Sequence, residues 1–341
     1  MATTRCRCYG SVKPKHRHFG SAERLAPVPE LRFSRNRNTG TSSRRDVLCG
    51  IVGGFAAAAL PATAHALDVL TDAATPGFLI LSGSGGNIVV LATSDGQIVV
   101  DSGNARSSGD VVATLRPLGK IAALVNTHWH KDQTGANEAL GRAGATIIAH
   151  EKTRQRLSAG WYVPAEDRYE EALPPAGRPT KAFFATGAMQ IGEKRVEFGY
   201  LIEAHTDGDL YVRFPDVNII AVGDVVSPER DPVLDWFGGG WLGGRVDALA
   251  KLLEIGDANT RYVPSFGPVI GRAEVQAEHD LMLAIFDRMV VNLRLGQTAA
   301  DMLKAGLLDG LPRTFEDPAK FLYDAHKGLW AHHNKLMHDI V

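Results

Sequence analysis

Residues 125–135 read Val-Asn-Thr-His-Trp-His-Lys-Asp-Gln-Thr-Gly, and this stretch governs the interpretation of the whole chain. It begins where the apolar run Ile121–Val125 predicts a short strand. In extended backbone, residues two apart face the same side, so we expect His128 and His130 to converge, with Asp132 nearby. Two imidazoles and a carboxylate are donors suited to zinc or iron. A bare His-x-His pair, however, is more often two solvated loop histidines.

Two later segments change that balance. The stretch EAHTDGDL begins at Glu203 and places His205 on a loop between two predicted strands. The stretch IIAVGDVVSP begins at Ile219 and ends a predicted strand with the acid Asp224. We expect Asp209, within the first of these stretches, to hydrogen-bond the backbone of its own loop.

In this order and spacing, THWHKDQTG, EAHTDGDL and IIAVGDVVSP resemble the motifs of the metallo-β-lactamase superfamily. The hairpin that ends in Asp101-Ser102-Gly103 resembles that family's usual lead-in, and the likeness covers roughly residues 70–271. The resemblance implies an α/β fold, an αββα four-layer sandwich in which two mixed sheets pack face to face between outer helices. It also implies a metal site at one edge. We expect Asp101 to stabilise a turn or to hold a ligand in place rather than to bind metal.

The resemblance also implies a role for each of the polar residues in these motifs. The histidines that bind the first metal in the family correspond here to His128, His130 and His205. The acid at the strand end, which bridges both metals in the family, corresponds to Asp224. The acid of the first motif, which binds the second metal, corresponds to Asp132.

Two positions depart from the family pattern. Gln133 stands where a histidine is usual, and Phe266 stands where the family has the histidine of a Gly-His-Gly segment. A neutral amide oxygen is a poor zinc donor, and a phenyl ring is none. The sequence therefore predicts one tightly bound zinc ion, with a second site that is weak or empty. Iron and manganese are alternatives for the same donors.

These residues predict a zinc-dependent hydrolase in which a metal-bound hydroxide attacks an ester, thioester, lactone or amide. Asp132 is the expected catalytic residue, because it would orient the attacking water or take its proton. The alternative is a non-catalytic metal-binding or assembly protein that keeps the fold with a degenerate second metal site. Gln133 and Phe266 favour that alternative, whereas the complete set of four ligands speaks against it.

The distribution of charge bears on possible partners. Residues 1–66 hold eleven Lys and Arg against three acids, a local charge of +8, so the rest of the chain carries −9 to give the total of −1. This net-acidic body argues against nucleic acid or an anionic membrane as a partner, and it favours a small-molecule substrate. The three cysteines, Cys6, Cys8 and Cys49, all lie before residue 67, so metal binding in the body must use histidines and carboxylates.

Residues 1–66 have the composition of a targeting presequence. Residues 1–43 are rich in Arg, Ser, Thr and Asn, like an organellar transit peptide, and residues 44–66 resemble a twin-arginine signal. The apolar run Val47–Leu60 has 14 residues, too few to span a bilayer, and cleavage is expected after Ala66. We expect a protein of the plastid thylakoid lumen, with the bacterial periplasm as the alternative and no stable membrane span after cleavage.

Residues 67–341 predict one metallo-β-lactamase-like domain with a helical extension from about residue 272, and they leave the oligomeric state open. Residues 160–185 contain four prolines and are expected to form a surface loop over a site. Five aromatic residues flank the inferred site and are equally consistent with a core cap and with a pocket wall. They are Trp161, Tyr162, Trp236, Phe237 and Trp241.

Overall fold

The structure is a computed structural model that describes residues 67–71, 75, 77–163 and 167–332, all within one compact unit, residues 60–341. The expected presequence, with its transit-like and twin-arginine parts, lies outside the described residues and stays a prediction. No helix in the described ranges is long and apolar enough to cross a membrane.

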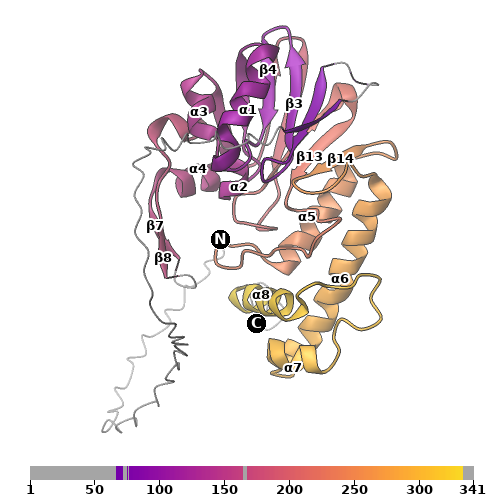
Figure 1. The fold of residues 1–341 in the computed structure, drawn as a ribbon. Coiled ribbons are helices and arrows are strands. Elements are labelled where there is room, and N and C mark those ends of the chain that lie inside the picture. The colour runs from indigo at the N-terminus through magenta and orange to yellow at the C-terminus, as the bar shows by residue number, and fades with distance from the viewer. Residues whose placement is uncertain (1–66, 72–74, 76, 164–166, 333–341) are drawn as a thin grey trace, which may run out of the picture. The chain divides into compact units, whose positions relative to one another are not determined.

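Two mixed sheets form the centre of the fold (Figure 1). In the larger sheet, β1 to β4 pair antiparallel, and β4, β5, β6 and β9 pair parallel in that order. The strand bounds are β1 (Asp68–Thr71), β2 (Phe78–Ser82), β3 (Ile88–Thr93), β4 (Gly96–Val100), β5 (Ile121–Val125), β6 (Thr146–His150) and β9 (Lys181–Phe183).

The second sheet has the order β10-β11-β12-β13-β14. Its first four strands pair antiparallel, and β14 lies parallel to β13. The bounds are β10 (Thr186–Ile191), β11 (Lys194–Tyr200), β12 (Leu210–Phe214), β13 (Ile219–Gly223) and β14 (Arg261–Pro264).

A layer of apolar side chains joins the inner faces of the two sheets. Val89 and Leu91 of β3 point into this layer, where they meet residues of the second sheet such as Phe198. Ile88 and Val90 of the same strand point the other way, as the two-residue period of a strand requires. Both faces of the inner strands β2 to β6 of the larger sheet are therefore buried, which explains why these strands are mostly apolar runs.

Helices cover the outer face of the larger sheet. Val111 and Leu115 of α1 and Leu140 of α3 are buried in one cluster with the outward-facing strand residues. The bounds on this side are α1 (Ser108–Leu115), α2 (Lys131–Thr134), α3 (Asn137–Arg142) and α4 (Glu151–Ser158). Short 3-10 turns are found at η1 (Ala105–Ser107), η2 (Arg116–Leu118), η4 (Pro175–Gly177) and η5 (Pro215–Val217).

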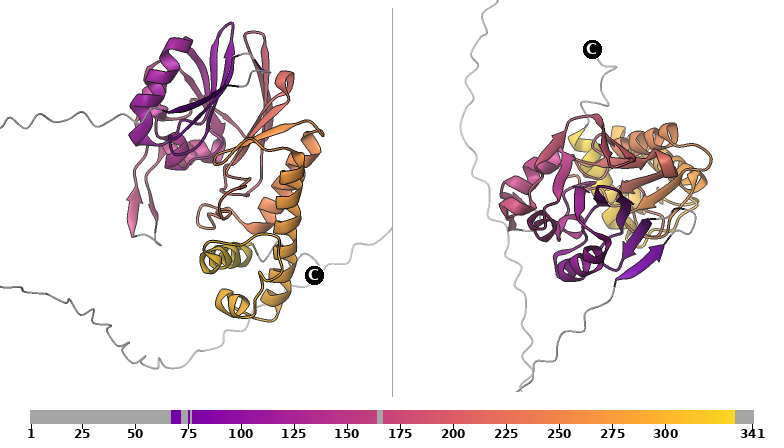
Figure 2. Two further views of the ribbon diagram at one scale, coloured as in Figure 1. Left: turned by 45° about the vertical axis from the view of Figure 1, so that its right-hand side comes forward. Right: turned by 90° about the horizontal axis from the view of Figure 1, so that it is seen from above.

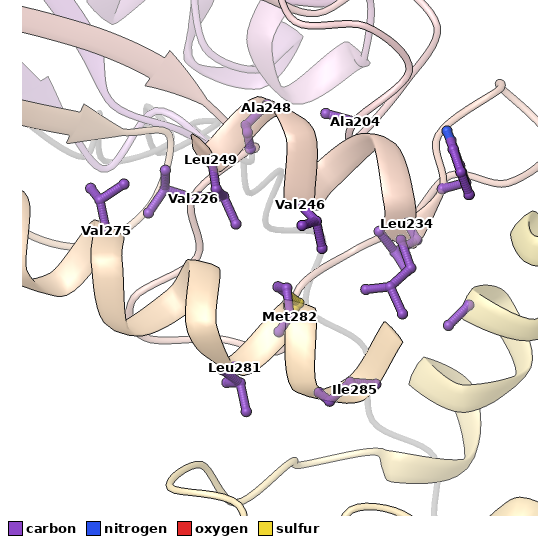
Figure 3. Close-up of a cluster of buried hydrophobic side chains, with 14 of the residues drawn as sticks. Ala204, Val226, Leu234, Val246, Ala248, Leu249, Val275, Leu281, Met282 and Ile285 are labelled. Carbon is purple, nitrogen blue, oxygen red and sulfur yellow. The ribbon is translucent and has the colours of Figure 1, made fainter. Parts of the chain in front are cut away.

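A second group of helices covers the outer face of the other sheet (Figure 2). Figure 3 shows part of this cluster, where Val246 and Leu249 of α5 pack with Met282 and Ile285 of α6. The expected αββα sandwich of two mixed sheets between helices is thereby confirmed. The bounds are α5 (Leu242–Ile255), α6 (Arg272–Arg294), α7 (Ala299–Lys304) and α8 (Pro318–Ala331).

Parts of the region 160–185, which was expected to form a surface loop, form β-strands. Its strands β7 (Trp161–Val163) and β8 (Arg168–Glu170) pair antiparallel, and β9 joins the edge of the larger sheet beside β6. The rings of Tyr162 and Tyr169 lie opposite each other across the β7–β8 pair, with centroids 5.9 Å apart. Aromatic pairs across two antiparallel strands stabilise their pairing. The strands were not predicted, because the prolines of the region favour a loop.

Candidate metal centre

Four side chains from three loops meet at one edge of the sheets. His128 and His130 follow β5, His205 lies in the loop between β11 and β12, and Asp224 follows β13. One donor atom of each residue lies within 4.8 Å of a donor atom of each of the others. The structure therefore brings together four of the five residues that the sequence singled out as ligands.

Thr127 and Asp101 set the orientation of His128. The backbone N–H and the hydroxyl of Thr127 donate to the two carboxylate oxygens of Asp101 at 2.8 and 2.7 Å. Because the hydroxyl proton is used there, the hydroxyl oxygen accepts a hydrogen bond of 3.1 Å from Nδ1 of His128. The lone pair of His128 is then on Nε2, a buried atom without a hydrogen-bond partner.

The other two imidazoles are held in the same way. Nε2–H of His130 donates to a carboxylate oxygen of Asp235 at 3.0 Å, and Nδ1–H of His205 donates to the carbonyl of Val233 at 2.9 Å. The remaining nitrogens, Nδ1 of His130 and Nε2 of His205, lie 2.9 Å apart. Two lone pairs at this distance repel each other unless a proton or a metal ion lies between them. Histidines that bind metals are held in this way: one ring nitrogen donates a hydrogen bond to a protein acceptor, and the other is left to coordinate the ion.

The spacing of the inner donor atoms fits a single metal ion. Oδ2 of Asp224 lies 3.4 Å from Nε2 of His205 and 3.8 Å from Nε2 of His128. Four donors at about 2.0–2.1 Å from a tetrahedral zinc ion lie roughly 3.3 Å from one another. Three of the six separations are 2.9, 3.4 and 3.8 Å, which bracket that value, and all six lie within 4.8 Å. The four residues therefore fit one divalent cation in both donor type and geometry.

The pKa values of the imidazoles show where the cluster attracts positive charge. Burial holds the pKa of His128 and of His205 well below the ordinary value, so both are neutral. Burial also lowers the pKa of His130, but the hydrogen bond and the charge of Asp235 outweigh it and raise that pKa above its ordinary value. A positive charge, whether a proton or a metal ion, is thus favoured between His130 and its neighbours.

Two buried carboxylates hold the ligand loops, as the sequence predicted. Asp209 accepts the backbone N–H groups of His205 and Thr206 at 2.7 and 2.8 Å, and Asp101 holds Thr127 as described above. Burial raises the pKa of Asp101 to about 8 and the pKa of Asp209 to about 7. A cation bound in the cluster would favour the ionised form of both groups by Coulomb attraction.

Asp224 faces in two directions. Its Oδ2 is the oxygen nearest the imidazoles, whereas its Oδ1 forms an ion pair with Nη2 of Arg230 at 2.8 Å. The guanidinium carbon of Arg230 lies 3.4 Å from the ring centroid of Phe266. Gly223 precedes Asp224 with a φ of 59°, and a Cβ there would lie 2.8 Å from the hydroxyl oxygen of Thr127. Glycine is therefore required for the turn that presents this carboxylate.

Asp132 and Gln133 lie in α2, directly after His130. Asp132 is not one of the four clustered residues in the described part of the chain, and its Oδ1 is buried without a hydrogen-bond partner. Burial and the charge of Asp224 raise the pKa of Asp132. Gln133 is fully buried, and neither polar atom of its side chain has a partner. The role of Asp132 as a ligand of a second metal stays a prediction.

A pocket of about 710 Å³ opens beside the cluster, and His130 and Asp132 are part of its wall. The β7–β8 hairpin and α8, which both project from the same side of the sheets, contribute further wall residues (Figure 1). The volume is in the range of sites for small molecules. Each Lys and Arg in the wall is paired with a carboxylate: Lys131 and Arg168 with Glu170, Arg156 with Asp207, and Lys320 with Asp324.

The five aromatic residues that flank the site divide into three environments. Trp161, Trp236 and Phe237 line the pocket. Tyr162 is 45% exposed, whereas Trp241 is only 7% exposed and belongs to the core formed with the helices. The sequence could not separate these roles, because all five lie in loops or short strands rich in Gly and Pro.

Two residues that organise the cluster were not predicted from the sequence. Asp235 fixes His130, and Arg230 binds Asp224. Both lie in the long connection between β13 and α5, where charged residues are ordinarily solvated. The available signal was their position, since they follow closely after a strand that ends in a predicted ligand.

Known proteins resemble this chain in sequence and in fold. A sequence profile described as the metallo-beta-lactamase superfamily matches residues 81–272, more than half of the chain. No curated protein matches the sequence. A metallo-beta-lactamase from Pontibacter korlensis superposes with a TM-score of 0.51 at 20% identity, over 64% of this chain and 99% of its own. The DIM-1 metallo-beta-lactamase gives 0.51 at 18%, over 64% and 97%.

A more distant structure covers more of this chain. A double mutant of the sec-alkyl sulfatase PisA1 superposes with a TM-score of 0.58 at 12% identity, over 78% of this chain and 50% of its own. At such low identities, the likeness to all three structures shows the fold alone.

Proposed function

The chain belongs to the metallo-beta-lactamase superfamily, and we propose that it is a zinc-dependent hydrolase that acts on an ester, thioester, lactone or amide of a small molecule. The observation that carries this proposal is the set of three imidazoles, each of which turns one free nitrogen toward a common point beside Asp224. A divalent ion bound there would lower the pKa of a water molecule to about 7 and polarise a substrate carbonyl.

His128, His130, His205 and Asp224 would hold the ion. Asp235 and Thr127 keep their imidazoles in the tautomer that directs a lone pair inward. Asp132 would act as the general base, because it lies in the pocket wall and its buried Oδ1 has no partner to compete for a proton. The raised pKa of Asp132 supports this role, since a base is most effective when its pKa approaches the working pH.

The walls of the pocket support a substrate with an uncharged, planar group. The rings of Trp129 and Trp161 lie edge to face with centroids 5.0 Å apart, and Phe237 stacks against Trp161 at 6.0 Å. Such rings bind planar apolar groups well. The wall holds four cationic and five carboxylate side chains, and each cation is paired with a carboxylate, for example Arg156 with Asp207, so the pocket offers little net positive charge to an anionic group. We therefore propose that the bound portion of the substrate is aromatic or otherwise apolar.

Metal removal and a matched substrate pair test the proposal. Protein purified without chelator should contain one metal ion per chain, lose hydrolysis after chelation and regain it with one equivalent of zinc. A phenylacetyl ester should be cleaved more efficiently than the acetyl ester of the same phenol. Protein that hydrolyses equally well without metal would contradict the proposal.

The alternative is a metal-binding or assembly protein without catalysis. Two observations favour it, namely the loss of metal donors at Gln133 and Phe266 and the ion pair that occupies one oxygen of Asp224. One bound metal per chain, with no turnover of any of the four substrate classes, would support this alternative.

A further inference from the structure

Arg230 forms an ion pair with the carboxylate oxygen of Asp224 that is not the one nearest the imidazoles. Its Nη2 lies 2.8 Å from Oδ1 of Asp224, and its guanidinium lies on the ring of Phe266, with 3.4 Å from the guanidinium carbon to the ring centroid. A guanidinium clamped between a carboxylate and an aromatic face has favourable contacts on both sides. The side chain of Arg230 is one-third exposed, but the carboxylate that it binds is almost fully buried.

With Arg230 in this place, one oxygen of Asp224 is bound by the guanidinium and the other is left for a metal ion. Oδ2 lies 3.4 Å from His205 and 3.8 Å from His128 and is available to a metal ion. Oδ1 is already bound by a group that is charged at every physiological pH, because arginine cannot be deprotonated in proteins. A second divalent ion on Oδ1 would have to expel the guanidinium or stand beside it.

The two residues that stand where the family has histidines fit the same assignment. Phe266 offers no metal donor but presents the aromatic face on which the guanidinium lies. Gln133, likewise a poor donor for zinc, is buried close to the backbone of Gly86 without a polar partner. The positive charge of Arg230 also acts to lower the pKa of Asp132, so this one cation stabilises the ionised forms of both Asp132 and Asp224.

We propose that Arg230 is a permanent cation that takes the place of a second metal ion at Asp224 and restricts the centre to one exchangeable metal. The inference rests on the proposed single-metal centre and adds the residue that enforces it. Arg230 would be a positioning residue, because it acts through Asp224 and not on the substrate.

The decisive experiment counts metal ions in variants of the full chain. Metal-free protein is titrated with Co²⁺, whose absorption reports coordination, and bound metal is checked by elemental analysis. The wild type and the Gln133→His, Phe266→His double variant should each bind one ion tightly. Addition of Arg230→Met to that double variant should create a second binding event. Two tight sites in the double variant, or one in the triple variant, would overturn the inference.

A matched control isolates the charge of Arg230. Arg230→Lys in the double variant keeps the positive charge and should still bind one ion, with any second event at least about tenfold weaker than with Arg230→Met. Equal behaviour of the Lys and Met variants would show that charge is not the cause. If the double variant does not fold, the same Lys and Met comparison is made in the wild-type background, where Met alone should admit a weak second ion. If the proposed hydrolase function is wrong, the wild type will bind no metal, or its activity will not change when the metal is removed.

Discussion

The negative charge of the buried Asp224 carboxylate can be balanced in different ways at its two oxygens. On one side, three imidazoles each direct one ring nitrogen toward a common point that fits a cation, and each is held by a hydrogen bond to Thr127, Asp235 or the Val233 carbonyl. On the other side, the chain supplies the cation itself, as a guanidinium that lies on an aromatic ring. A buried carboxylate must be compensated in either case. We infer that an exchangeable ion and a covalently attached cation can both neutralise a single carboxylate.

Removal of one imidazole should abolish metal binding on the imidazole side of Asp224. With His205→Ala or His128→Ala, purified protein should contain almost no zinc, because the remaining donors no longer surround an ion. Metal content by elemental analysis checks this. His279→Ala, at a residue outside the cluster that contacts Asp280, is the matched control and should keep its metal. A His205→Ala protein with one zinc per chain would rule out the proposed ligand set.

Replacement of Asp132 should separate metal binding from catalysis. Asp132→Asn should retain one metal ion, since Asp132 is not among the four clustered residues, but its turnover should fall by about 10²–10⁴-fold through loss of the base. Steady-state kinetics and metal content are measured on the same sample. Asp324→Asn changes another pocket carboxylate, which is paired with Lys320, and should have a far smaller effect. Metal loss in Asp132→Asn would make Asp132 a ligand instead.

Asp235→Asn tests how strongly the support behind an imidazole matters. The amide is a weaker acceptor for Nε2–H of His130, so zinc affinity should fall by about 10–100-fold without loss of the fold. Competition with a coloured chelator measures this change. Asp231→Asn is the control, because Asp231 accepts backbone N–H groups of Glu316 and Asp317, away from the imidazoles. Equal affinities of the two variants would contradict the assigned role of Asp235.

The pH dependence of metal binding should reveal a competing proton on His130. The pKa of His130 is raised, so below that pKa a metal ion must displace its proton, and the zinc dissociation constant should rise at least about tenfold per unit fall in pH. His128 and His205 have lowered pKa values and add no further protons in this range, whereas Asp101 and Asp209, whose pKa values are raised to about 8 and about 7, release protons if a bound cation favours their ionised forms. Zinc titrations between about pH 5 and 7 check the slope. Asp235→Asn should lower the pKa of His130 and shift the onset to lower pH, and an unchanged onset in that variant would contradict this assignment.

The motifs of the sequence, through the family that they resemble, predicted the architecture and singled out the four residues that the structure brings together. His128, His130, His205 and Asp224 stand at the ends of predicted strands, and strand ends that share one edge of a sheet bring such residues together. The two sheets were implied by the resemblance to the superfamily, and the strand pattern by itself predicted only an α/β domain. Gln133 and Phe266 were recognised from the sequence as poor metal donors.

The partners of these residues depended on tertiary structure. Asp235 meets His130 across 105 positions of the chain, and the Val233 carbonyl meets His205 across 28, through loops whose paths have no periodic sequence signal. The same holds for the division of the aromatic residues, where Trp161 faces the pocket and Trp241 faces the helical core. The type of each donor is a property of the residue, and sequence determined it. The cation that each donor faces is a property of packing, and only the fold placed Arg230 on Phe266 beside Asp224.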